Sequence, residues 1–127
     1  MVLSFKEKFI PLILDGKKIH TLRTDSFDRW GVGASIHFST GAGTSHKEHL
    51  CKECVSTQRI EIYWEINNKE KLEKPKILID RRLITEQEID LLAKNDGFDS
   101  TEQFLSWDAW NKKAFIGKII HWTDKKY

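Results

Sequence analysis

The residues best suited to chemistry stand close together in the segment GKKIHTLR, at positions 16–23. Lys18 and Arg23 supply positive charge, and Thr21 between them supplies a hydroxyl group. This combination suits a ligand that carries phosphate or carbonyl oxygens, and a lysine can also activate a hydroxyl as a nucleophile. The alternative is a solvated basic turn, because runs of charged residues lie mostly on the surface.

A carboxylate that could complete such a site is Asp96, which lies in the sequence Asn95-Asp96-Gly97 at the end of a predicted helix. The alternative is a purely structural role, since Asn-Asp-Gly is also typical of turns. In a regular strand, Lys18 and Thr21 would lie on opposite faces. We therefore expect a turn or bulge between them if they act together.

A third group of reactive residues lies between positions 46 and 54. The C-x-x-C pair can hold half of a tetrahedral zinc site, and two histidines precede it. One short segment supplies all four side chains, however, which makes the geometry cramped. A polar loop with one packed cysteine is the alternative, and we predict no bound metal or other cofactor. The four residues are His46, His49, Cys51 and Cys54.

The elements that must position these residues follow from the hydrophobic pattern. The predicted strands cover residues 34–39, 57–66, 76–83 and 114–122, and the predicted helices cover residues 6–15, 85–94 and 100–111. Residues 3–5 fit a short strand or the lead-in to a helix, and residues 45–54 are polar and irregular. Capping-box patterns at Thr85 and Ser100 start the last two helices, and Gly16 ends the first. Strands and helices mix without a repeating unit, which indicates an α+β fold.

The composition fits a single ordinary domain of 127 residues, with 39% hydrophobic and 31% charged residues. The net charge of +2 is too small for wholesale coating of duplex nucleic acid. A local basic groove remains open, because residues 1–24 hold five Lys and Arg against two acids. No apolar run is long enough for a membrane span, and no signal peptide is evident, so we expect a cytoplasmic protein. No obligate protein partner is indicated.

Two stretches resemble the ASCH family of the PUA-like superfamily. The first is Gly16-x-Lys18-x-x-Thr21-x-Arg23, and the second is the run AKNDGFDS at residues 93–100, which resembles the family pattern A-x-x-(acid)-G-F-x-S. The resemblance covers roughly residues 3–122. It implies a small mixed β-barrel flanked by helices, in one domain over residues 1–127 with a variable loop insertion at about 41–56.

The resemblance also implies a function. The family is associated with RNA or nucleotide binding, so we expect a basic cleft that binds RNA or a modified nucleoside. Arg23, Lys17 and Trp30 are then the predicted ligand-binding residues, with Trp30 as the surface on which a base stacks. This interpretation ranks above two enzymatic alternatives.

In the first enzymatic alternative the chain is an amidohydrolase that acts on N(4)-acetylcytidine-type nucleosides. The family's catalytic lysine, threonine and glutamate correspond to Lys18, Thr21 and Asp96. Asp96 departs from the family pattern because it is one methylene shorter than glutamate, and small displacements of a reacting group slow catalysis strongly. The second enzymatic alternative is a ribonuclease.

Overall fold

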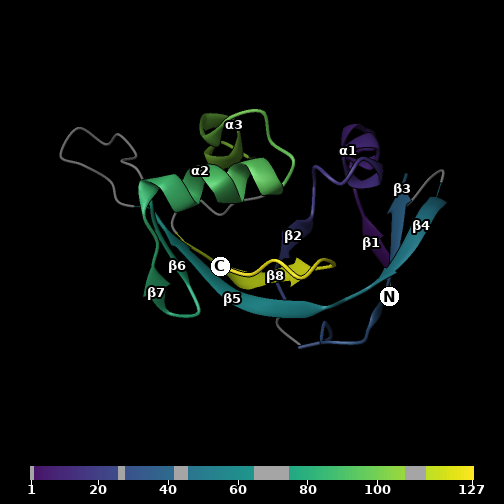
Figure 1. Cartoon of the computed structure of the whole chain (residues 1–127), viewed down its shortest axis with the longest axis horizontal. Helices are drawn as coiled ribbons and strands as arrows, with labels where there is room; N and C mark the ends of the chain where they lie inside the picture. Colours follow the sequence, from purple (N-terminus) through teal and green to yellow (C-terminus); the bar gives the residue numbers. More distant parts are fainter. Residues whose placement is uncertain (1, 26–27, 42–45, 65–74, 108–113) are drawn as a thin grey trace.

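The computed structural model describes residues 2–25, 28–41, 46–64, 75–107 and 114–127 (Figure 1). Its fold is α+β, with two sheets and a few short helices. The strands are β1 (Val2–Ser4), β2 (His20–Arg23), β3 (Ser35–Thr40), β4 (Lys47–Glu53), β5 (Ser56–Tyr63), β6 (Lys76–Ile79), β7 (Arg82–Leu83) and β8 (Ala114–His121). The helices are the 3₁₀ turn η1 (Glu7–Phe9), α1 (Ile10–Leu14), α2 (Glu86–Asn95) and α3 (Thr101–Leu105). None of the described helices is long and apolar enough to cross a membrane.

The larger sheet has the strand order β2-β8-β5-β6-β7 and is antiparallel throughout. The smaller sheet has the order β1-β3-β4, in which β1 runs parallel to β3. Strand β8 pairs with β2 on one side and with β5 on the other. Residues 20–23, which form β2, are therefore held at the edge of the larger sheet by β8. In Figure 1, α2 and α3 lie together on one side of the larger sheet, and α1 lies near β1.

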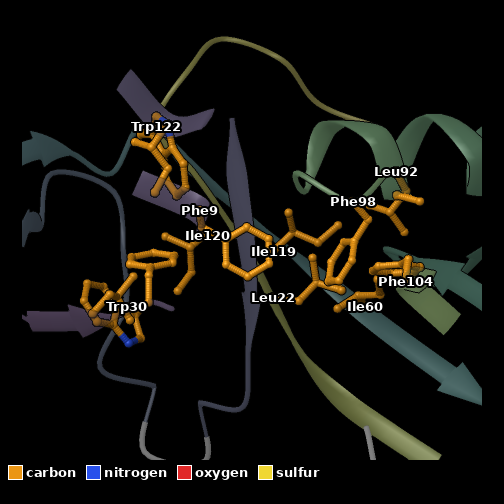
Figure 2. Close-up of a cluster of buried hydrophobic side chains, with 14 of the residues drawn as sticks. Phe9, Leu22, Trp30, Ile60, Leu92, Phe98, Phe104, Ile119, Ile120 and Trp122 are labelled. Carbon is orange, nitrogen blue, oxygen red and sulfur yellow. The ribbon is translucent and has the colours of Figure 1, made fainter. Parts of the chain in front are cut away.

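One hydrophobic core holds these layers together. Ile60 of β5 and Ile119 of β8 are fully buried, as alternation of apolar residues in a half-buried strand requires. Leu92 of α2 and Phe104 of α3 pack onto this surface, and Phe98 lies beside Phe104 (Figure 2). This packing fixes the end of α2 over the sheet.

The turn after α1 leads directly into β2. Pro11 lies in the first turn of α1, where its missing N–H does no harm. Gly16 has φ +76 and ends the helix as expected. The amides of Lys17 and Lys18 then donate to the carbonyl of Leu12 at 2.9 and 3.0 Å. The predicted helix over residues 6–15 is therefore a 3₁₀ turn followed by a short α-helix.

The prediction of an irregular loop within residues 41–56 is wrong for residues 47–53, which form β4. This strand pairs with β3, for example His37 with Cys51. Its sequence KEHLCKE lacks alternating apolar residues because both of its faces are partly or fully exposed. Cross-strand polar contacts of His37 with Glu48 and of Thr40 with His49 accompany the pairing.

Two other predicted elements have different boundaries in the structure. The strand predicted at 76–83 is the hairpin β6–β7, whose turn holds Asp80 and Arg81 at positive φ. The helix predicted over 100–111 ends at Leu105, and residues 108–113 lie outside the described residues. The capping box at Thr85 is confirmed, and Ser100 caps α3 by accepting from the amide of Gln103 at 3.1 Å.

Candidate functional site

The two sequence motifs meet where α2 ends and β2 begins. The amide of Ile19 donates to the carbonyl of Asn95 at 2.9 Å, which ties the two segments together. Lys18 Nζ then donates to the backbone oxygen of Asp96 at 2.6 Å and lies 3.2 Å from its carboxylate Oδ1. Lys18 and Asp96 are only 2% and 4% exposed, so this is a buried ion pair.

Lys18, Thr21 and Asp96 line one cavity of about 390 Å³. Lys18 lies before the first residue of β2, so the alternation of a regular strand does not separate it from Thr21. Arg23 shares the face of Thr21 and donates to its hydroxyl oxygen at 3.4 Å. The three residues predicted to be catalytic and Arg23 therefore line the same cavity.

Aromatic rings form the apolar part of this cavity. Its aromatic lining consists of Phe5, Phe9, Phe98, Trp107 and Phe115. Lys18 Nζ lies 4.8 Å from the centre of the Phe9 ring, and the Arg23 guanidinium lies 5.0 Å from that of Phe5. The rings thus pack against the cations and also give the cavity flat apolar surfaces.

Burial dominates the electrostatics of Lys18. Removal from water lowers the pKa of its amine, the carboxylate of Asp96 raises the pKa by attraction and hydrogen bonding, and Arg23 lowers it further. The net shift is downward. This is the direction that a lysine needs in order to accept a proton from a hydroxyl group.

His20 is the residue of the site that the sequence interpretation missed. It is fully buried, and its Nδ1 lies 3.0 Å from Asp96 Oδ1. Its Nε2 lies 2.6 Å from the hydroxyl of Tyr127, which is 107 positions away in the sequence. His20 lies within the segment of residues 16–23, but no local sequence pattern connects it with a partner so distant.

Lys17 and Trp30 are not brought to this cavity. Lys17 is exposed and lies outside the cavity lining. Trp30 is buried in the hydrophobic core and borders a separate hollow beside Arg23. Among the described tryptophans, Trp107 is the one that lines the cavity, with Lys6 Nζ 4.6 Å from its ring centre. Trp107 is thus the better placed surface for stacking.

The four candidate zinc ligands have other surroundings. His49 Nε2 lies 2.8 Å from Thr40 Oγ1, and the buried thiol of Cys54 donates to the carbonyl of Ser56 at 3.5 Å. Cys51 is exposed on β4, and His46 precedes that strand. Within the described part of the chain, no three His, Cys, Asp or Glu side chains lie close enough together to hold a metal ion.

Gly97 is where the site requires glycine, and its replacement by alanine should destabilise the fold. Its φ of +90 is strained for any other residue, and a Cβ there would lie 3.2 Å from Lys18 Cβ and from Phe9 Cδ1. We expect Gly97→Ala to cost about 1–3 kcal/mol in urea unfolding. Gly16→Ala is the matched control, because Gly16 also has positive φ but open space around it. Equal losses in the two variants would contradict the tight packing of Gly97 on Lys18.

Comparisons with known proteins do not assign the chain to a family. No family model, no curated protein and no solved structure matches the chain.

Proposed function

We propose that the chain is an ASCH-type domain that binds the base of RNA, or of a nucleotide or nucleoside, in the cavity around Lys18. The observation that carries the proposal is the meeting of Lys18, Thr21, Arg23 and Asp96 in one aromatic-lined cavity. Its volume of about 390 Å³ is within the usual range for small-molecule sites. We further infer that the two sheets correspond to the small mixed barrel of PUA-like domains, flanked by the helices. The order of elements along the chain supports this inference.

The cavity offers both kinds of contact that an unpaired base needs. Aromatic faces such as that of Trp107 can stack on a base whatever its sequence. Lys18 and Arg23 can donate to carbonyl oxygens, and the Asp96 carboxylate can accept from an exocyclic amine. Lys6 and Lys8 lie beside Trp107, where phosphate groups of a strand would meet positive charge.

Arg23→Ala should weaken binding about tenfold or more, because hydrogen bonds to charged groups are the stronger ones. The measurement is a calorimetric titration with cytidine, with cytidine 5′-monophosphate and with a short single-stranded RNA. Arg59→Ala on β5 is the control, since it removes the same charge from an exposed site paired with Glu61. Binding of the RNA should also weaken as salt is added. No binding at low salt, or equal losses in both variants, would count against the proposal.

A second candidate is the hydrolysis of an N(4)-acylated cytidine, and the lowered pKa of Lys18 beside Thr21 and Asp96 favours it. In this scheme the neutral Lys18 amine takes the Thr21 proton, and Thr21 Oγ1 attacks the acyl carbon. The bond to the cytosine amine breaks as that nitrogen receives the proton that Lys18 took from Thr21, either directly or through the Asp96 carboxylate. Water then hydrolyses the acyl-threonine and releases the carboxylic acid.

Thr21→Ala and Lys18→Ala should each abolish release of acetate from N(4)-acetylcytidine, if the chain is this hydrolase. The first removes the nucleophile and the second removes the base. Acetate is measured by NMR during incubation, with Thr57→Ala on β5 as the control for loss of a threonine. Full activity of Thr21→Ala would eliminate this mechanism. Shortening of an RNA strand in the same incubation would favour the ribonuclease alternative instead.

A further inference from the structure

A directed chain of hydrogen bonds leads from Tyr127 to the Asp96 carboxylate. Asn95 Nδ2 donates to the Tyr127 hydroxyl oxygen at 2.9 Å. That hydroxyl lies 2.6 Å from His20 Nε2, and His20 Nδ1 lies 3.0 Å from Asp96 Oδ1. The His20 ring is fully buried between the two, so both of its nitrogens need partners inside the protein.

The proton positions in this chain follow from the partners. A carboxylate can only accept, so Nδ1 of His20 must carry the proton that points at Asp96. The Tyr127 oxygen already accepts from Asn95, so its own proton is available for Nε2. Burial lowers the pKa of His20 and raises that of Tyr127 to about 12. The imidazole of His20 is therefore neutral, and the phenol of Tyr127 keeps its proton.

A clamp on the backbone of Tyr127 aims its hydroxyl at His20. Gln58 Nε2 donates to the main-chain oxygen of Tyr127 at 2.7 Å, and the Tyr127 amide donates to Gln58 Oε1 at 2.9 Å. Gln58 is itself buried in β5, with His121 Nε2 3.0 Å from its Oε1 and its Nε2 donating to Asp80. The chain end in Figure 1 accordingly lies beside β5 and β8. Because the amide oxygen of Gln58 can only accept, His121 must carry its proton on Nε2, whereas His20 carries its proton on Nδ1.

We propose that His20 and Tyr127 are positioning residues, which hold the Asp96 carboxylate against the Lys18 amine through the Nδ1–H form of His20. Both Lys18 and His20 reach the same oxygen, Oδ1. The carboxylate is thus oriented by two donors, and the other oxygen, Oδ2, is the one that we expect a ligand to meet. The functional part of this inference rests on the proposed cavity site, whereas the proton positions do not.

The direct test is nitrogen NMR of the histidine rings in the wild-type chain, without any ligand. We expect protonated Nδ1 and bare Nε2 for His20, and the reverse for His121, which is an internal reference. In Tyr127→Phe, the proton should stay on Nδ1 of His20 because Asp96 still accepts it, but the Nε2 resonance should shift because Nε2 loses its hydrogen-bond donor, while His121 stays unchanged. Tyr63→Phe is the matched control, because it removes an exposed hydroxyl that bonds Glu61. A wild-type His20 that carries its proton on Nε2, or on both nitrogens, would overturn the proposal.

The positioning role has a second readout at Lys18. A loosened Asp96 stabilises the ammonium form less, so the pKa of Lys18 should fall in Tyr127→Phe and stay unchanged in Tyr63→Phe. An unchanged Lys18 pKa in Tyr127→Phe would overturn the role of Tyr127. Binding of cytidine should weaken on the order of threefold to tenfold in Tyr127→Phe, the effect of one lost hydrogen bond. Absence of binding by the wild type would defeat the proposed function and leave the two NMR readouts to decide this inference alone.

Discussion

Asp96→Asn is expected to destabilise the folded chain by about 3 kcal/mol at neutral pH, because it leaves the buried Lys18 ammonium without its countercharge. Lys18 is 2% exposed, so water cannot replace the lost carboxylate. The same variant weakens the contact to His20. Urea unfolding measures the loss, and Asp99→Asn is the control because Asp99 is exposed three residues away. The control should stay within about 0.5 kcal/mol of the wild type.

The deficit of Asp96→Asn should shrink as the pH rises. Burial already lowers the pKa of Lys18 in the fold, and loss of Asp96 lowers it further. The unfolded chain keeps an ordinary lysine with a pKa of about 10.4. Between the folded and unfolded pKa values the unfolded state binds more protons, so stability increases with pH, and it increases more in the variant because its folded pKa is lower. A deficit that does not change between pH 6 and pH 10 would contradict a charged, uncompensated Lys18.

Gly117→Ala is expected to cost about 3 kcal/mol, because β8 passes too close to β2 for any side chain at this position. An added Cβ would lie 2.4 Å from the carbonyl oxygen of Arg23 and 2.9 Å from the Phe115 ring. The nearest atom belongs to backbone, so relief requires β2 to move away from β8. Since β2 carries Thr21 and Arg23, the variant should also weaken ligand binding.

Gly31→Ala is the control for that experiment, because nothing lies within 4 Å of a Cβ there and its φ is not positive. Thermal unfolding followed by circular dichroism compares the two variants with the wild type. If Gly117→Ala unfolds at the wild-type temperature, the close approach of β8 to Arg23 is wrong.

The sequence predicts best those features that depend on neighbouring residues. Gly16 and the Thr85 capping box end and start helices through local hydrogen bonds, and both are found in the structure. The alternation around Ile60 predicts β5 because one face of that strand is buried. The meeting of Lys18 and Asp96, which are 78 positions apart, is the exception, and it was expected only from the family resemblance of the two stretches.

The features that the sequence did not predict depend on long-range packing. Strand β4 has no buried face, so its pairing with β3 leaves no hydrophobic pattern. The contact of His20 with Tyr127 joins two segments that only the sheet brings together. Trp30 and Trp107 look alike in sequence, and only the fold decides that Trp30 is core and that Trp107 lines the cavity.

The most direct measurement of the central claim is a titration of the labelled chain with cytidine and with a short single-stranded RNA, followed by proton–nitrogen NMR. The proposed site predicts that the Trp107 indole N–H and the backbone amides of Lys18, Thr21 and Phe98 shift together with one affinity. The indole N–H resonances of the buried Trp30 and Trp122 should not shift. Shifts confined to other surfaces, such as β4, or no shifts at millimolar ligand, would contradict a base-binding cavity at Lys18.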